Sequence, residues 1–266
     1  MVKIAIKSVA LASLFVSLNI HAFASDLTND EVLKLIDIAG KQRMLSQRIV
    51  KDYLYVGKDV VKDKAEKELK YSLDEFKNGK KYILSISNDK EIINLVSFID
   101  MSLTEFIDLL NEDFDVDNAK IAMDLSESIL EGSQFIVNNL EKKYGSNPNN
   151  VINIARKQRM LSQRIAKYYI AYQNGVKDAN TVKQIHNAVK EFAINHKILL
   201  ENKNNTDKIN RKLREVGNLW SVVYKFYNNI EEGGLPFIVF TSTDKITKKM
   251  DNIVQEYTKL KEGEKK

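Results

Sequence analysis

Apolar residues recur every three or four positions over most of the chain, which is the spacing of an amphipathic helix. Only two prolines and ten glycines occur in 266 residues. These low numbers do not suit an architecture rich in turns, so the pattern favours helices over strands. The sequence therefore predicts an all-α fold.

Breaks in this pattern divide the chain into eight expected helices. The first opens at a capping box formed by Thr28 and Glu31 and runs to about Gly57. The third opens at a similar pair, Asn88 with Glu91. The helices after the first are expected at residues 63–85, 88–110, 117–140, 149–174, 180–203, 206–231 and 240–261.

One stretch of the sequence occurs twice. Residues 41–49, KQRMLSQRI, return unchanged as residues 157–165, and an offset of 116 or 117 also aligns the later helices. We interpret the chain as an internal duplication that gives two tandem four-helix bundles. The bundles are expected at residues 25–144 and 151–266, with a linker at 145–150.

On a helix, the repeated stretch presents two faces. The core face spans about 60° of the helix, the width of a face packed into its own bundle. The pairing face lies about 100° further round and has the spacing of a seam between two helices. The core face comprises Leu35, Ile38, Gln42, Leu45, Ile49, Tyr53 and Val56, and in the second copy Val151, Ile154, Gln158, Leu161, Ile165 and Tyr169. The pairing face comprises Val32, Ile36, Ala39, Arg43, Ser46 and Val50, and in the second copy Ile152, Ala155, Arg159, Ser162 and Ala166.

Each pairing face carries one arginine, Arg43 or Arg159. An unpaired buried cation is costly, so each guanidinium needs a counter-charge. Four antiparallel helices return the chain to its starting end, so a short linker starts the two signature helices, which carry KQRMLSQRI, in the same direction. The two arginines are then expected at the same height. Either they bind an anion, or each pairs with a carboxylate such as Glu31 or an acid on a neighbouring helix.

Residues 39–48, AGKQRMLSQR, resemble the signature of the PilJ-type domain, the N-terminal sensor domain of type IV pili methyl-accepting chemotaxis transducers. They are also similar to the periplasmic input domain of nitrate/nitrite sensor kinases. The resemblance implies four-helix bundles that hold nitrate between the first helices of two protomers, through the arginine before the methionine. It gives that role to Arg43 and Arg159, with the backbone near Gly40 close to the anion. The second copy has Arg156 in place of this glycine, which either prevents close approach of the backbone or adds a donor.

The candidate ligand-binding residues lie on the pairing face or next to it. Gln42 and Gln158 are included although they lie on the core face, where the alternative is a buried amide that bridges helices. Lys41, Gln47 and Arg48 lie off both faces, so we expect them in a solvated surface or in exposed ion pairs. The full set of candidates is Arg43, Arg159, Gly40, Ala39, Ala155, Arg156, Ser46, Ser162, Gln42 and Gln158.

Residues 1–24 have the pattern of a secretory signal: two lysines, an apolar run, and an A-x-A cleavage site that ends at Ala24. We therefore expect a periplasmic protein that begins at Ser25, with an uncleaved anchor as the alternative. Removing those two lysines from 41 basic residues leaves 39 against 36 acidic ones. This surplus is too weak to predict nucleic-acid binding. The absence of cysteine excludes disulfides and thiol chemistry.

Catalytic and metal-binding motifs are not apparent in the sequence. His186 and His196 do not share a helix face, so a solvated or core-edge position is preferred over a metal site. Asp113, Asp115 and Asp117 alternate as in an EF-hand loop, but the required glycine and final glutamate are missing, which favours acids that cap a helix. We predict no enzyme, no cofactor and no metal site.

The sequence therefore predicts a periplasmic sensor or binding module that holds a small planar oxyanion, nitrate or nitrite first, between its signature helices. Planar guanidinium donors match planar oxygens. The two bundles are expected to form an intramolecular pseudo-dimer, with a homodimer as the alternative. The rival function is a ligand-free interaction protein whose signature helices pair with a membrane chemoreceptor, a histidine kinase or a pilus component.

Overall fold

The computed structural model describes residues 27–144 and 150–263. This part of the chain contains eight α-helices, one short 3-10 helix and no strand, which confirms the all-α prediction. The expected signal sequence and nearly all of the expected linker lie outside the described residues. The helices are α1 (Asn29–Gly57), α2 (Lys62–Ile86), α3 (Lys90–Leu109), α4 (Val116–Lys143), α5 (Val151–Gln173), α6 (Ala179–Leu200), α7 (Asp207–Asn228) and α8 (Pro236–Gly263), with the 3-10 helix η1 (Ile230–Glu232) before α8.

Side chains cap most of these helices in the way their sequences suggest. The capping box of α1 is present: the Glu31 N–H donates to Thr28 Oγ1 at 3.3 Å, and the Thr28 N–H donates to the Glu31 carboxylate at 2.9 Å. Asp115 caps α4 by accepting the Asn118 N–H at 2.7 Å. The acids before α4 therefore include a helix cap, as preferred over a calcium loop.

Two of the expected helix starts are wrong. The cap of α3 is Asp89 and not Asn88, since the Asp89 carboxylate accepts the Glu91 N–H at 3.0 Å. α8 begins at Pro236, four residues before the expected position. Proline suits the first turn of a helix because the N–H it lacks would have no partner there.

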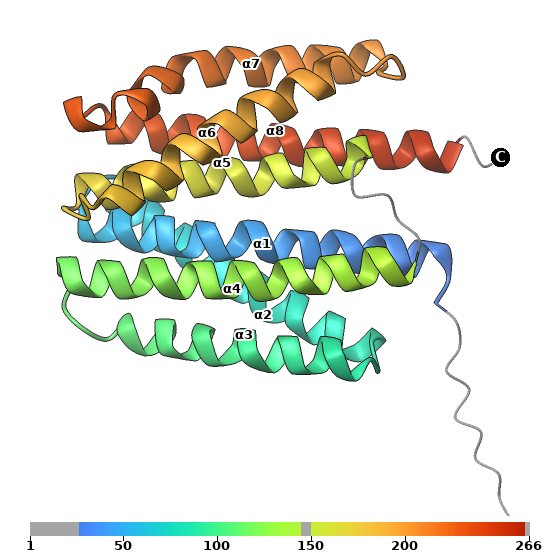
Figure 1. The fold of residues 1–266 in the computed structure, drawn as a ribbon, viewed down its shortest axis with the longest axis horizontal. Helices are drawn as coiled ribbons and strands as arrows, with labels where there is room; N and C mark the ends of the chain where they lie inside the picture. Colours follow the sequence, from blue (N-terminus) through green and yellow to red (C-terminus); the bar gives the residue numbers. More distant parts are fainter. Residues whose placement is uncertain (1–26, 145–149, 264–266) are drawn as a thin grey trace, which may run out of the picture.

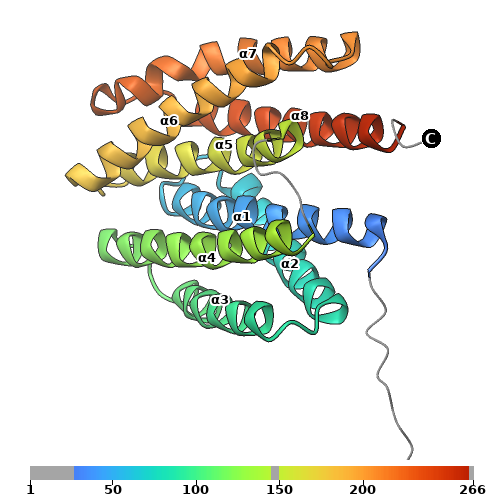
Figure 2. The same ribbon diagram turned by 45° about the vertical axis from the view of Figure 1, so that its right-hand side comes forward.

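The two signature helices, α1 and α5, lie side by side at the centre of the molecule and run in the same direction (Figure 1). α4 packs against α1, and α8 packs against α5. α3 and α7 form the outer edges, while α2 and α6 cover opposite faces, an arrangement also visible in Figure 2. Every position of the two predicted pairing faces is buried. The parallel packing brings residues 39–50 of α1 to the same level as residues 155–166 of α5.

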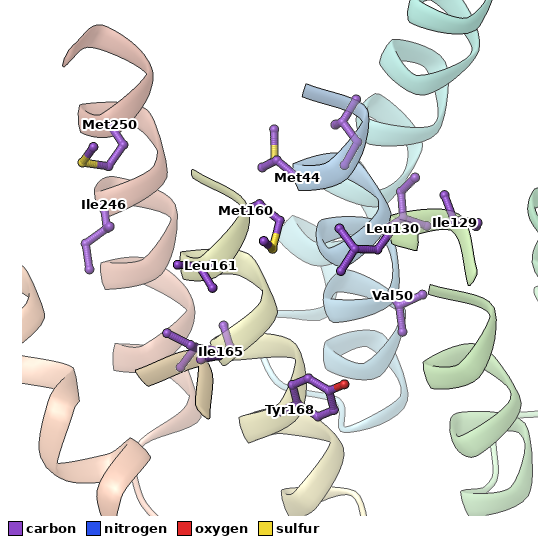
Figure 3. Close-up of a cluster of buried hydrophobic side chains, with 14 of the residues drawn as sticks. Met44, Val50, Ile129, Leu130, Met160, Leu161, Ile165, Tyr168, Ile246 and Met250 are labelled. Carbon is purple, nitrogen blue, oxygen red and sulfur yellow. The ribbon is translucent and has the colours of Figure 1, made fainter. Parts of the chain in front are cut away.

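Apolar side chains fill the spaces between these four central helices. Met44 and Met160 point into the space between α1 and α5 (Figure 3). Leu161 and Ile165 face Ile246 and Met250 of α8 in the same view. Burial of such side chains contributes about 1.5–3 kcal/mol each, which holds the signature helices rigidly against their neighbours.

Reciprocal ion pairs connect the two halves of the chain. Lys51 of α1 donates to Asp244 of α8 at 2.8 Å, and Lys167 of α5 donates to Glu127 of α4 at 2.6 Å. Glu127 and Asp244 are 117 positions apart, as the repeat requires. Both lysines are fully buried. The contacts resemble those of a two-fold symmetric interface within one chain. The duplication itself and the domain boundaries remain predictions.

Candidate functional site

Three arginines meet at Gly40, where α1 and α5 pack together. A methyl group added at Gly40 would lie 3.4 Å from Nη2 of Arg43, 3.7 Å from Cδ of Arg156 and 3.9 Å from Nη2 of Arg159. All three arginines are at most 5% exposed. The sequence predicted that Arg43 and Arg159 converge, and the structure places them together with Arg156 on the same glycine. We call these three residues the arginine cluster.

Two acids balance the α5 side of the arginine cluster. Arg159 donates to Asp251 of α8 at 2.5 Å and to Asp37 of α1 at 2.9 Å. Arg156 donates to Asp37 at 3.2 Å and to Asn153 at 3.1 Å. Burial alone would raise the pKa of Asp37, but the two guanidiniums hold it below its usual value. Arg159 therefore follows the alternative given for the signature arginines, in which the guanidinium pairs with carboxylates of neighbouring helices.

Arg43 has different partners. Its Nη1 donates to the amide oxygen of Gln134 on α4 at 2.7 Å. Among the described residues, no carboxylate lies within ion-pair distance of Arg43, and its buried Nε has no hydrogen-bond partner. Burial lowers the pKa of Arg43 to about 10, and repulsion from Arg159 and Arg156 acts in the same direction. This arginine is a buried cation without a close counter-charge.

The difference between the arginines arises from two pairs of equivalent positions. Asp37 of α1 corresponds to Asn153 of α5 at an offset of 116, and Gln134 of α4 corresponds to Asp251 of α8 at an offset of 117. Each pair holds one acid and one amide. Both acids contact Arg159. The charges around the two signature arginines are therefore asymmetric, although the motif that carries these arginines is identical in both copies.

A third acid, Glu141 of α4, acts on the cluster from a longer distance. Glu141 is 7% exposed, and burial raises the pKa of its carboxyl while attraction to Arg43 and Arg156 opposes the rise. Three guanidiniums thus face two ion-paired carboxylates and one carboxyl that is more easily protonated than usual. The cluster carries one excess positive charge when Glu141 is protonated, which matches one monovalent anion.

The other candidate residues mostly have partners within their own half of the chain. Gln42 Nε2 donates to the carbonyl of Phe76 at 3.0 Å, and Gln158 Nε2 donates to the carbonyl of Phe192 at 3.1 Å. These are the buried amides that bridge helices, the alternative given for both glutamines. The hydroxyls of two further candidates, Ser46 and Ser162, donate to the carbonyls of Arg43 and Arg159 respectively, each at 2.8 Å.

Ala39 and Ala155 are buried and bring no polar group to the site. Their small side chains suit the close packing of the central helices. Ser162 lies against Thr247 of α8, with 2.7 Å between the two hydroxyl oxygens. This contact directs Ser162 toward its own bundle.

One expectation about the signature is wrong. Gln47, expected at a solvated surface, is fully buried, and its Nε2 donates to the carbonyl of Ser126 on α4 at 3.1 Å. α4 covers this side of α1, which the core face alone could not indicate. Lys41 and Arg48 do form partly exposed ion pairs, with Glu75 and Glu68 respectively.

Sequence reasoning missed the residues that distinguish the two arginines. These residues lie outside the repeated stretch: Asp37 on α1, Gln134 and Glu141 on α4, and Asp251 on α8. The available signal was the exchange of acid and amide at equivalent positions of the repeat. This exchange can be interpreted only when the register of α4 and α8 against the signature helices is known, because the register decides which side chains contact the arginines.

Metal chemistry has no support in the described part of the chain. No group of three or more His, Cys, Asp or Glu side chains there could hold a metal ion. His196 is largely buried and stacks on Phe192, with 6.1 Å between ring centroids. Among the described helices, none is both long enough and apolar enough to cross a membrane.

Comparison with known proteins finds a family model that matches part of the chain. Residues 143–233 match the family model described as PilJ, Type IV pili methyl-accepting chemotaxis transducer N-term. This segment covers about a third of the chain and includes Arg156, Arg159 and the second copy of the signature. No curated protein and no solved structure matches the chain. We call this segment the PilJ region, because it is similar to the N-terminal domain of type IV pili methyl-accepting chemotaxis transducers.

Proposed function

We propose that this protein is a sensor module that binds one small planar monoanion, nitrate or nitrite first, between α1 and α5. The observation that carries the proposal is the buried Arg43 guanidinium, which has an amide partner but no close carboxylate. A buried charge without a counter-charge destabilises the protein, and an anion beside it offsets that cost. Binding energy is therefore available at this position.

The chemistry of the site favours a small, planar and singly charged ligand. A guanidinium offers forked donors that match two oxygens of a planar anion. The two carboxylates on Arg159 repel a second negative charge. The proposed ligand role rests first on Arg43, then on Arg159 and least on Arg156, with Gly40 leaving space between them.

The rival function is an interaction protein whose signature helices pair with a membrane chemoreceptor or a sensor kinase. In the structure, the pairing faces of α1 and α5 are already buried within this chain. A partner would have to displace those contacts before using the same faces. The PilJ region suggests a role in chemoreceptor signalling. A signalling partner could instead contact another surface of the anion-bound module without displacing these contacts. We expect the protein to act outside the cytoplasm, in agreement with the secretory pattern of residues 1–24.

A calorimetric titration of the mature chain, residues 25–266, with nitrate, nitrite and chloride tests the proposal. We expect one planar anion per chain, the same stoichiometry at high and low protein concentration, and weaker binding of chloride. Two anions per chain, or binding only at concentrations where the protein dimerises, would argue for pairing between chains. No heat and no thermal stabilisation with any of the three anions would contradict the proposed function.

A further inference from the structure

A cleft of about 410 Å³ opens between α1, α2 and α8. Of the residues that form the arginine cluster and its ion pairs, only Arg159 and Asp251 reach this cleft. Buried Met44 and Leu45 provide an apolar lining, and the exposed ring of Tyr71 stands at its edge. The volume is in the range of pockets that bind small organic molecules.

The lining of the cleft has an excess of positive charge. It contains six basic and three acidic side chains. Glu68 accepts from Arg48 at 3.0 Å, and Asp244 lies 3.6 Å from the exposed ammonium of Lys64. By contrast, Lys245 and Lys248 of α8 have no ion-pair partner in the described part of the chain. The acids of the cleft are thus engaged while two exposed ammonium groups remain.

This surplus is not a by-product of the repeated sequence. The residues 117 positions before Lys245 and Lys248 are Ser128 and Glu131, and the residue 116 positions after Lys64 is Asn180. The equivalent surface of the other half therefore lacks these three positive charges. The positive charge of this cleft is therefore a feature of one side of a nearly two-fold arrangement.

The positions of the basic groups define the shape of that ligand. Lys245 and Lys248 are three residues apart on one helix, so their side chains are neighbours on the same face. Lys64 comes from α2, on the opposite wall. Deeper in the cleft, the Nε atoms of Arg48 and Arg159 are buried without a hydrogen-bond partner. A ligand that contacts both walls needs a negative group at each end and carbon atoms to lie over the apolar lining.

We propose that this cleft is a second ligand site, adjacent to the arginine cluster with which it shares Arg159, and that it binds a small dicarboxylate. One carboxylate lies between Lys245 and Lys248, and the other contacts Lys64, where it competes with Glu68 and Asp244 for the ammonium group. We expect a compact anion such as phosphate to bind more weakly, because it has no carbon atoms to lie over the apolar lining. The site is independent of nitrate binding, so either site can be absent while the other is present.

The test is a calorimetric titration of the mature chain with succinate, with inorganic phosphate as the compact probe. We expect succinate to bind, and the variant Lys245→Ser with Lys248→Glu, which introduces the residues found at 128 and 131, to bind it about tenfold more weakly or worse. Lys64→Ser should weaken succinate binding from the opposite wall. Both changed positions of the double variant are exposed, so folding should be preserved, as circular dichroism can verify.

A matched control changes the same charge elsewhere. Lys142→Ser with Lys259→Glu alters exposed lysines outside the cleft and should leave succinate affinity within about twofold. Nitrate affinity should be the same in both double variants, which separates this site from the arginine cluster. The proposal is overturned if succinate does not bind, if phosphate binds as tightly as succinate, or if the control weakens binding as much as the cleft variant.

Discussion

The two signature arginines occupy identical sequence contexts but different electrostatic environments. Arg159 donates to two carboxylates, Asp37 and Asp251, which hold its pKa above the usual value despite burial. Arg43 donates to the amide of Gln134, and burial lowers its pKa to about 10. The motif therefore determines where the guanidiniums lie, while residues outside the motif determine which guanidinium has a carboxylate partner.

This comparison indicates a division of roles within one interface. A guanidinium held by two acids ties α1, α5 and α8 together and fixes the geometry of the cluster. A guanidinium without an acid supplies the uncompensated charge that an anion can neutralise. If the two arginines had identical environments, each would have to both hold the helices together and bind the anion. The following experiments either remove this asymmetry or measure it.

The largest effect is expected from Arg43→Ala, which should weaken nitrate binding by about 10- to 100-fold because it removes the free charged donor. Its unfolding free energy should stay the same or rise, since the change removes a buried cation without a counter-charge. Arg159→Ala should also lose nitrate binding, but it should lower the unfolding free energy by about 1–3 kcal/mol. Calorimetry and urea denaturation measure the two effects.

Lys41→Ala is the control for these substitutions, because Lys41 carries the same charge two residues from Arg43 and pairs at the surface with Glu75. It should change nitrate affinity by less than about twofold. Equal losses of stability in Arg43→Ala and Arg159→Ala would show that both arginines act structurally, and the contrast between them would be lost.

A second contrast separates the two buried lysines, because Lys51 is followed by Asp52 whereas Lys167 is followed by Tyr168. Burial raises the pKa of Asp52 to about 7 from a usual value of 3.8, although Lys51 opposes the rise. A carboxyl with a raised folded pKa contributes stability below its unfolded pKa, and this contribution is lost as pH rises through the folded pKa.

The unfolding free energy of Asp52→Asn, measured relative to that of the unmodified chain, should therefore rise by at least about 1 kcal/mol from about pH 4 to pH 7. Denaturant unfolding at both pH values gives this difference. Tyr168→Phe, at the position equivalent to Asp52, should show no such pH dependence over the same range. A constant stability difference between Asp52→Asn and the unmodified chain would place the titrating group elsewhere.

The protonation of Glu141 should adjust nitrate affinity. Burial raises the pKa of this carboxyl, so it takes up a proton at a higher pH than an exposed glutamate does. Protonation removes a negative charge near Arg43, and nitrate should then bind a few-fold more tightly, about two- to fivefold. Glu141→Gln should bind tightly at pH 7 and lose most of this pH dependence. The same pH dependence in the variant would exclude Glu141 as its source.

The smallest effect is expected from Arg156→Gly, which makes the second copy resemble the first at the position of Gly40. Asp37 keeps its bond to Arg159 in this variant, so the fold should persist. Nitrate affinity should change less than it does in Arg159→Ala. Complete loss of binding would instead identify Arg156 as a principal ligand.

The local signals in the sequence predicted much of this arrangement. The spacing of apolar residues predicted all eight helices, and the pair Thr28 and Glu31 predicted the first cap correctly. The parallel course of the signature helices followed from counting antiparallel helices in the first half. Gln42 and Gln158 fit the expected bridging amides. These features depend on short segments or on chain direction.

The partners of the arginines could not be predicted in this way. They depend on how α4 and α8 are rotated and shifted against the signature helices, which is decided by packing over the whole molecule. Gln47 shows the same difficulty, since α4 buries a side chain that lies off both predicted faces.

The central claim is that Arg43 binds an anion because its partner on α4 is an amide. Gln134→Glu tests this most directly, since it places a carboxylate of nearly the same shape at the 2.7 Å contact and leaves every arginine in place. Calorimetric titration of the unmodified chain and this variant with nitrate should show one anion bound by the first and affinity at least about tenfold lower in the second. The variant should also unfold at a higher temperature. Equal nitrate affinity in the two proteins would contradict the account.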